Sequence, residues 1–290
     1  MRPAGVVDSG RGLAPRSHLG WGYTDRAEFR TSAREYLADG IAAGQRTEYL
    51  GSGGVDQLRA ELAGFADVDE LLGRGDLRVA SVDEVYEFAG ATRVVDPVAS
   101  VAARVAATEA ALAAGYTGLR AAVDATALAR TDTQRAAYAH YEYLLDQRSS
   151  KLALATICAY DLTQLGHAAA AELVCLHPWV RRGCTPFRLY AEDGTDFALA
   201  GEIDIYGIAQ LETALGQILP LMPGTELVVG GRGLQYIDHR GLLVLDRCAG
   251  KRGTRLVLQT EHRGVARVAE MIGVKHVRVE ASGERRRTDR

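Results

Sequence analysis

A glycine-rich turn, Gly51-Ser52-Gly53-Gly54, stands between a short apolar stretch and a segment with helical periodicity. The backbone N–H groups of such a turn can hold an anion. A later expected strand ends in the carboxylate of Asp124, and together these features suggest a nucleotide site. A phosphate-binding P-loop also needs a lysine and a hydroxyl residue after its second glycine. Here Val55-Asp56-Gln57 follows, and Asp56 would repel a phosphate, so the sequence predicts no ATP hydrolysis.

Several polar or reactive side chains fall at or near the ends of expected strands: His18, Asp124, Glu142, Cys158, Asp161 and His177. In parallel α/β sheets, ligands bind beyond the carboxyl ends of the strands, so we expect Asp124 and Asp161 to line a ligand crevice. The spacing of the histidines and cysteines predicts no metal site. We expect Cys158 to be a small buried core residue, and His177-Pro178 to end a helix.

The chain contains no G-x-S-x-G, no H-E-x-x-H and no dinucleotide fingerprint, so we predict a non-catalytic protein without cofactor or metal. The predicted ligand-binding residues are His18, Tyr23, Gly51, Ser52, Asp124, Glu142 and Asp161. Two alternatives stay open. One is a nucleotide- or small-molecule-binding switch or enzyme centred on the first half of the chain, and the other is a constitutive adaptor that binds no ligand.

The C-terminal third holds a second candidate site, the expected strand-to-helix loop Ile237-Asp238-His239-Arg240-Gly241. A helix N-terminus carries unsatisfied N–H groups and the positive end of the helix dipole. We predict that a protein partner docks there. The predicted partner-binding residues are Asp204, Tyr236, Ile237, Asp238, His239, Arg240 and Gly241.

Helical periodicity and apolar stretches alternate through the first 177 residues. Helices are expected at residues 25–44, 55–64, 97–114, 132–147 and 165–176, and strands at 47–50, 76–80, 118–124 and 152–160. This alternation predicts an α/β fold with a doubly wound, mostly parallel sheet. Residues 1–15 have no periodicity and are predicted to be a flexible leader.

A domain boundary is expected at residues 181–186, where two arginines, a glycine and a proline interrupt the pattern. Beyond it, strands are expected at 187–191, 197–203, 226–230, 255–259 and 276–279. Helices are expected at 208–219, 241–250 and 264–272. This ββαβαβαβ order predicts a small mixed sheet with helices packed on it, over residues 187–281, followed by a basic tail at 282–290.

Composition limits the class of protein and partner. Hydrophobic residues make up 47% of the 290 residues and charged residues 24%, as in ordinary globular domains. The net charge of −3 gives no reason to expect nucleic acid as a partner. No apolar stretch is long enough for a membrane helix, and the four cysteines form no C-x-x-C pair. We therefore expect a cytoplasmic protein that binds neither nucleic acid nor membrane.

The C-terminal segment, about residues 187–280, resembles a STAS domain, the fold of anti-sigma-factor antagonists. The matching landmarks are Gly201-Glu202-Ile203-Asp204, Leu227-Val228-Val229, Tyr236-Ile237-Asp238 with Gly241-Leu242, Gly250-Lys251-Arg252-Gly253 and Met271-Ile272-Gly273-Val274. The resemblance implies binding to an anti-sigma factor or a related histidine-kinase-like ATPase. It also implies an Asp-Ser-Ser/Thr-Gly loop whose second hydroxyl is phosphorylated.

The loop departs from that pattern where the switch should be. Here it reads Asp238-His239-Arg240-Gly241, so both hydroxyl positions are lost and Arg240 takes the place of the phosphoacceptor. The acid usually found after the third strand is replaced by Gly230-Gly231. We therefore expect docking without a serine phosphorylation switch.

Residues 16–180 resemble the MEDS sensory domain, a relative of RecA-type folds without the P-loop. The matching segments are His18-Leu19-Gly20-Trp21-Gly22-Tyr23, residues 36–45, Tyr86, residues 115–120, Asp124, Tyr141-Glu142, Cys158-Ala159-Tyr160-Asp161 and His177-Pro178. The resemblance implies a small-molecule sensor fused to an output module. Together, the two resemblances predict a non-catalytic signalling protein in which a ligand-sensing domain is coupled to a partner-binding domain.

Overall fold

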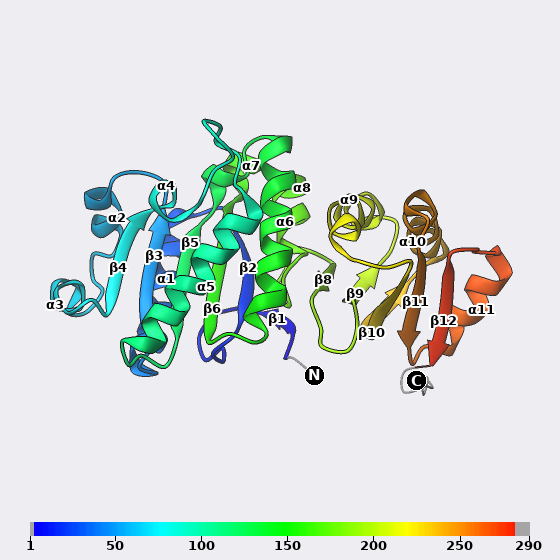
Figure 1. Ribbon diagram of the computed structural model, residues 1–290, viewed down its shortest axis with the longest axis horizontal. Helices are drawn as coiled ribbons and strands as arrows, with labels where there is room; N and C mark the ends of the chain where they lie inside the picture. The colour runs from blue at the N-terminus through cyan, green and yellow to red at the C-terminus, as the bar shows by residue number, and fades with distance from the viewer. Residues whose placement is uncertain (1–2, 282–290) are drawn as a thin grey trace. The chain divides into compact units, whose positions relative to one another are not determined.

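The computed structural model describes residues 3–281, which divide into two compact units, Pro3–Thr185 and Pro186 onward (Figure 1). The first unit is built on one sheet. Its strands are β1 (Gly5–Val7), β2 (His18–Tyr23), β3 (Arg46–Gly51), β4 (Leu77–Ser81), β5 (Leu119–Asp124), β6 (Leu154–Asp161) and β7 (Trp179–Arg181). They lie in the order β1-β7-β2-β6-β5-β3-β4, and every neighbouring pair is parallel.

Helices cover both faces of this sheet (Figure 1). They are α1 (Arg26–Ala42), α2 (Val55–Glu61), α3 (Val68–Arg74), α4 (Val82–Val85), α5 (Pro97–Ala113), the 3-10 turn η1 (Thr126–Leu128), α6 (Asp132–Ser149), α7 (Leu162–Leu165) and α8 (His167–Val174). Helix α1 packs across β2, β3, β5 and β6 on one face, while α5, α6 and α8 pack against one another on the opposite face. The predicted doubly wound, parallel α/β sheet is therefore confirmed.

The alternation of side chains along a strand separates the two faces. In β2, Leu19, Trp21 and Tyr23 join the apolar core beneath α1. The intervening residues His18 and Gly20 therefore face α6 and α8, since a strand sends successive side chains to opposite sides. This parity assigns the polar residues of one strand to two different environments.

One edge of the sheet, formed by β1 and β7, differs from the prediction. Residues 1–15 were expected to be a flexible leader, but Gly5–Val7 pair in parallel with Trp179–Arg181 and form β1. The segment continues onto the core, where the backbone carbonyl of Leu13 accepts a hydrogen bond from Arg120 at 3.1 Å. The expected linker at 181–186 likewise begins inside β7. Both strands have only three residues, which is too short for period-2 alternation to be visible in the sequence.

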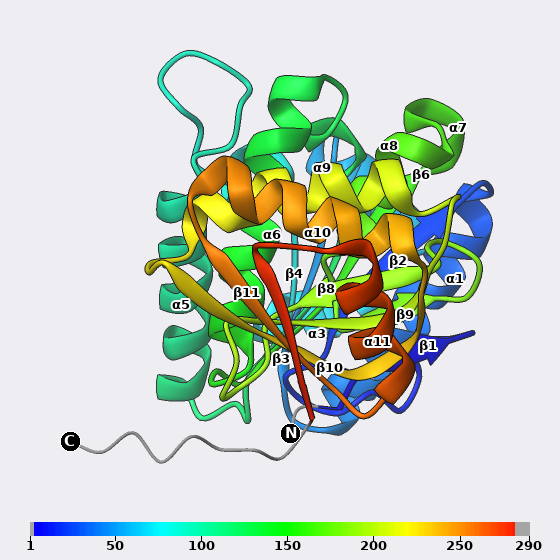
Figure 2. The same ribbon diagram turned by 90° about the vertical axis from the view of Figure 1, so that its right-hand side faces the viewer.

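The second unit is a five-stranded mixed sheet in the order β12-β11-β10-β9-β8. Its strands are β8 (Phe187–Tyr190), β9 (Phe197–Ile203), β10 (Glu226–Ile237), β11 (Arg255–Thr260) and β12 (Val277–Ala281). Only the β8–β9 pair is antiparallel. The helices are α9 (Ile208–Ile218), the turn η2 (Leu219–Leu221), α10 (His239–Arg252) and α11 (Arg263–Ile272). Figure 2 shows α9 and α10 side by side over the sheet, and the predicted ββαβαβαβ order is confirmed.

Strand β10 is longer than predicted. The expected strand ended at Gly230, but β10 runs on to Ile237 with two register shifts against β9, even though glycine weakens a strand. Close packing against neighbouring strands, and not a turn, explains why glycine occupies these positions. A Cβ at Gly231 would lie 2.9 Å from the carbonyl oxygen of Gln259, and one at Gly233 would lie 2.7 Å from the Cβ of Ala200.

Candidate functional site

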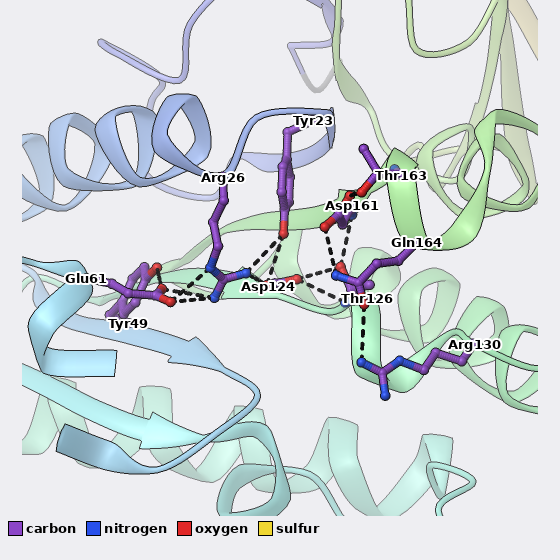
Figure 3. Close-up of polar contacts among 10 residues, drawn as sticks. All are labelled: Tyr23, Arg26, Tyr49, Glu61, Asp124, Thr126, Arg130, Asp161, Thr163 and Gln164. Carbon is purple, nitrogen blue, oxygen red and sulfur yellow. Dashed lines mark hydrogen bonds and ion pairs between the residues drawn. The ribbon is translucent and has the colours of Figure 1, made fainter. Parts of the chain in front are cut away.

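The carboxyl ends of β2, β5 and β6 carry a group of linked polar side chains, which we call the edge cluster (Figure 3). Its members are Tyr23, Arg26, Tyr49, Glu61, Asp124, Thr126 and Asp161. Strand parity explains why they meet: Tyr23 and Asp124 end their strands on the α1 side of the sheet, and Arg26 is the first residue of α1.

Arg26 is the hub of the edge cluster. Its Nη1 donates to Asp124 Oδ2 at 2.6 Å, and its Nη2 donates to Glu61 Oε1 at 2.7 Å. The Tyr23 hydroxyl donates to the same Asp124 oxygen at 3.1 Å, and the Tyr49 hydroxyl donates to Glu61 Oε2 at 2.7 Å. Asp124 is 2% exposed and Glu61 8%, whereas Arg26 is 33% exposed, so the Arg26 side chain is the part of this network that is most accessible to solvent.

Thr126 joins Asp124 to Asp161. The Thr126 hydroxyl donates to Asp124 Oδ1 at 2.6 Å and accepts from the backbone N–H of Asp161 at 2.9 Å. Asp161 caps α7, accepting from Thr163 N at 2.8 Å, and Gln164 Nε2 donates to its second oxygen at 2.7 Å (Figure 3). Although burial alone would raise the pKa of Asp161, these hydrogen bonds hold it below its ordinary value.

The charges of the edge cluster add up to a negative total. Arg26 is one cation among three carboxylates, those of Glu61, Asp124 and Asp161. Burial opposes the charge of Arg26, but the hydrogen bonds to Asp124 and Glu61 raise the pKa of its guanidinium above its ordinary value. Burial and the charge of Asp124 also raise the pKa of the Tyr23 phenol, so it remains a neutral donor. Such a site favours a neutral or cationic molecule over a phosphate.

Two predicted ligand residues lie beside the edge cluster without joining its hydrogen bonds. Gly51 ends β3, and a Cβ there would lie 2.8 Å from Leu58 Cδ2 and 3.9 Å from Asp124 Cβ. A larger residue at Gly51 would therefore push α2 away from the sheet. Ser52 follows at partial exposure, in the turn that leads to α2. Gly54 stands at the N-cap of that helix, with Asp56 in its first turn.

The other two predicted ligand residues, His18 and Glu142, lie elsewhere. They were expected near strand ends at the crevice, but His18 begins β2 and Glu142 lies inside α6. Together with Cys158 of β6 and His177, which follows α8, they form a second group, the buried cluster. His18, Glu142 and His177 are 0% exposed and Cys158 is 1% exposed. The cluster occupies the face of the sheet that α6 and α8 cover.

Hydrogen bonds hold Glu142 at the centre of the buried cluster. His18 Nε2 lies 3.0 Å from Glu142 Oε2, and the Tyr160 hydroxyl donates to Glu142 Oε1 at 2.5 Å. The other ring nitrogen of His18, Nδ1, lies 3.0 Å from Asp146 Oδ1. The Cys158 thiol donates to Glu142 Oε2 at 3.5 Å. One carboxylate of α6 thus faces groups from two strands, β2 and β6.

The electrostatics of this cluster are strongly coupled. Burial opposes the charge of His18, but the carboxylates of Asp146 and Glu142 raise the pKa of its imidazole. Burial would raise the pKa of Glu142, yet His177 and His18 hold it well below its ordinary value. Burial and the charge of His18 lower the pKa of His177. Burial and Glu142 raise the pKa of the Cys158 thiol.

The predicted partner-binding residues lie on two adjoining segments of the second unit, Asp204–Tyr206 and Tyr236–Gly241. We call Asp204–Tyr206 and Tyr236–Arg240 the loop face; Ile237 within it is buried, at 7% exposure. Strands β9 and β10 end side by side, with Ile237 paired to Ile203, and Asp238 N donates to the carbonyl of Ile203 at 3.0 Å. Asp204 Oδ1 accepts from Tyr206 N at 3.0 Å, which fixes the first loop.

Asp238 is the N-cap of α10. Its side chain accepts from Gly241 N at 2.8 Å, which satisfies one of the free N–H groups at the helix start. His239 and Arg240 fill the first turn and are exposed. Gly241 is buried. A Cβ there would lie 2.7 Å from Ile237 Cγ1, so this position has no room for a side chain. The predicted loop is therefore a direct strand-to-helix junction with a single capping residue.

Sequence reasoning missed several residues of these sites, among them Arg26, Glu61 and Asp146. One signal was present for Asp146. It stands four residues after Glu142 on an expected helix, so both acids share a face, and that face also carries Tyr138 and Leu145 at helical spacing. Two acids on the apolar face of a helix indicate buried partners. Arg26 and Glu61 gave no comparable signal.

Comparisons with known proteins bear on the first unit. The model of the MEDS family, described as MEthanogen/methylotroph, DcmR Sensory domain, matches residues 17–178. This match defines the protein as a sensory one. The chain belongs to the MEDS family, and a sensory role in signalling follows from that membership.

Among solved structures, the chain is similar to the crystal structure of a KaiC-like protein from the hyperthermophilic archaeon Pyrococcus horikoshii OT3. The identity is 14%, the TM-score is 0.40, and the match covers 69% of this chain and 89% of that one. A search of curated proteins finds no match. Within residues 3–281, no helix combines the length and apolar character needed to cross a membrane.

Proposed function

We propose that this chain is a non-catalytic signalling protein whose MEDS domain senses a small molecule and whose C-terminal unit acts as a STAS-type docking module. The partner that we infer is an anti-sigma factor or a related histidine-kinase-like ATPase. The observation that carries the output half is the exposure of Tyr206 and Tyr236, at 88% and 53%, beside the N-terminus of α10. Aromatic side chains are enriched in the cores of protein interfaces, where they contribute much of the binding energy.

The loop face combines this apolar surface with charge. Ile205 adds a third exposed apolar side chain at 54%, and Arg240 contributes a cation within the first turn of α10. Asp238 is committed to capping the helix. Within residues 236–242 the one hydroxyl belongs to Tyr236. We therefore propose docking that serine phosphorylation does not control.

The sensing half of the proposal rests on the edge cluster. A family of sensory domains needs a ligand site, and ligands of parallel α/β sheets bind at the carboxyl ends of the strands. The negative charge total there argues for a small neutral or cationic molecule. Arg26 and Tyr23 are the groups that such a molecule would displace from Asp124, because Arg26 is the most solvent-accessible member of that hydrogen-bond network.

The docking half is tested by measuring binding of the full chain to a panel of anti-sigma-type ATPase domains. We expect Tyr206→Ala combined with Arg240→Glu to lower affinity at least tenfold, because the change removes an apolar anchor and reverses a charge. The matched control is Met271→Ala, which truncates an apolar side chain of α11 that is 76% exposed. Equal loss in both variants, or no binding by the wild type, contradicts the docking proposal.

A second function, a constitutive adaptor without a ligand, has one observation in its favour: the charged groups of the edge cluster already satisfy one another. Thermal unfolding of the wild type and Arg26→Gln in the presence of small neutral and cationic compounds separates the two. A compound that stabilises the wild type and not the variant supports sensing. Partner binding with no stabilising compound supports the adaptor, and micromolar ATP binding that Asp124→Ala abolishes contradicts both.

A further inference from the structure

The buried cluster brings four donor atoms of metal-ligand type together from four separate segments. The donor atoms of His18, Glu142, Cys158 and His177 all lie within 4.8 Å of one another. Cys158 Sγ is 3.6 Å from His18 Nε2 and 3.5 Å from Glu142 Oε2, and His177 Nε2 is 3.5 Å from the same oxygen. Neighbouring ligands of a tetrahedral zinc ion lie about 3.3–3.8 Å apart, given its bond lengths. These three separations fall in that range, whereas the 3.0 Å between His18 Nε2 and Glu142 Oε2 is shorter, so binding an ion would move these two ligand atoms slightly apart.

The orientation of His177 points to a cation. Its Nδ1 lies 3.1 Å from the carbonyl oxygen of Leu173, which can only accept, so Nδ1 carries the proton. In the neutral ring, Nε2 is then a lone pair. This Nε2 is buried and has no hydrogen-bond partner among residues 3–281, although it faces Glu142 Oε2. When the ring is neutral, two acceptors face each other in a buried site, which is unfavourable. A proton on Nε2 or a cation between the two atoms would satisfy both.

Hydrogen bonds from residues outside the four ligands also orient His18 and Glu142. His18 directs Nδ1 at Asp146, which leaves Nε2 directed toward the cluster. Glu142 accepts from Tyr160 on one oxygen, so the second oxygen is the one that faces inward. Metal-binding histidines and carboxylates are oriented by such outer partners.

Space around the cluster is matched to the His177 ring. Gly20 lies next to Cys158 across the β2–β6 pairing. A Cβ at Gly20 would lie 2.9 Å from His177 Nδ1 and 3.0 Å from its Cγ. The absence of a side chain at Gly20 therefore lets the imidazole pack directly on the sheet. This provides a steric reason for the position of the fourth donor.

We propose that the buried cluster binds one divalent transition-metal ion of the zinc type through His18 Nε2, Glu142 Oε2, Cys158 Sγ and His177 Nε2. Two imidazoles, a thiolate and a carboxylate are borderline-soft donors that suit zinc better than magnesium or calcium. One thiolate and one carboxylate neutralise the divalent ion, which removes most of the cost of burying it. The proposal does not depend on the docking function or on a ligand at the edge cluster.

Binding has a defined proton balance. The Cys158 thiol loses its proton to solvent when sulfur bonds to the metal, and a proton on His18 Nε2 must leave in the same step. The ion would tie β2, β6, α6 and the segment after α8 into one unit. Because the cluster is buried, we expect the metal to enter during folding or local opening.

The test uses untagged full-length protein, refolded with Zn²⁺ or Co²⁺ and then freed of excess metal. We expect about one ion per chain by elemental analysis, as for a closed four-ligand site. The cobalt form should show a sulfur-to-cobalt charge-transfer band in the near ultraviolet. Cys158→Ser should abolish that band, and His177→Gln should lower metal content at least tenfold. Asp146→Asn should weaken binding about 10- to 100-fold through its contact with His18.

The matched control is Cys175→Ser, another fully buried cysteine, whose thiol donates to the backbone carbonyl of Glu172. It should keep the metal and the absorption band. A folded wild-type chain that retains neither metal overturns the proposal, whether or not the variants fold. A cobalt spectrum without the sulfur band, or one that persists in Cys158→Ser, overturns it as well.

Discussion

The edge cluster and the buried cluster lie on opposite faces of the same sheet, and in each a buried carboxylate has several polar partners. In the edge cluster, Asp124 pairs with Arg26, whose side chain is 33% exposed, so water can take over part of any lost contact. In the buried cluster, Glu142 is 0% exposed and its contacts are with histidines, a thiol and a phenol. A polar group at a strand end can therefore replace a lost hydrogen bond with one to water. A polar group between the sheet and its helices depends on its protein partners.

The largest expected effect comes from Glu142→Ala. It leaves the hydroxyl of Tyr160 and Nε2 of His18 buried without their acceptor, and breaking a buried charged pair costs about 3–5 kcal/mol. Urea unfolding followed by circular dichroism measures the loss. A loss below about 1 kcal/mol, the range of an exposed ion pair, would mean that the cluster is not a tightly coupled unit.

A smaller effect is expected from Gly20→Ala. The added methyl would overlap the His177 ring, and overpacking of this kind costs about 1–3 kcal/mol. The control is Gly73→Ala in α3, where an added Cβ would meet no atom within 4 Å. This substitution should stabilise the helix by about 0.5–1 kcal/mol. Thermal unfolding should move the two variants in opposite directions. The same direction in both would show that the His177 ring has room to move.

The smallest effect is expected from Arg26→Gln in the edge cluster. Asp124 and Glu61 lose their shared cation, but each keeps a tyrosine donor, so we expect a loss of about 1–2 kcal/mol. Arg74→Ala, which removes surface ion pairs with Glu70 and Asp76, is the control and should change stability by less than about 1 kcal/mol. An Arg26 variant less stable than Glu142→Ala would reverse the contrast between the two clusters.

The sequence allowed most of the fold to be predicted, because long helices and buried strands leave clear periodicity. Strand β2 was missed because Gly20 and Gly22 alternate with its apolar residues and it has no β-branched residue. Strands β1 and β7 are too short to show a period. Asp124 and Asp161 were predicted together because both close expected strands.

The convergence of the buried cluster could not be predicted in this way. Its four residues are up to 159 positions apart, and their meeting depends on three independent facts: the face to which β2 directs His18, the rotation of α6, and the path of the chain after α8. The spacing of residues along the sequence gives no information about any of these three facts. The sequence did contain one local sign of the cluster: one face of α6 carries two acids among its apolar residues.

The pairing of β1 with β7 has a consequence for how the first unit folds. Gly5–Val7 align with Trp179–Arg181, and a Cβ at Gly5 would lie 2.8 Å from the Trp179 ring. The sheet edge is thus completed by segments more than 170 residues apart, and contacts of such long range slow folding. During synthesis, β1 cannot pair with β7 until almost the whole domain has been made. Until then, the edge of the nascent sheet beside β2 has no strand paired to it.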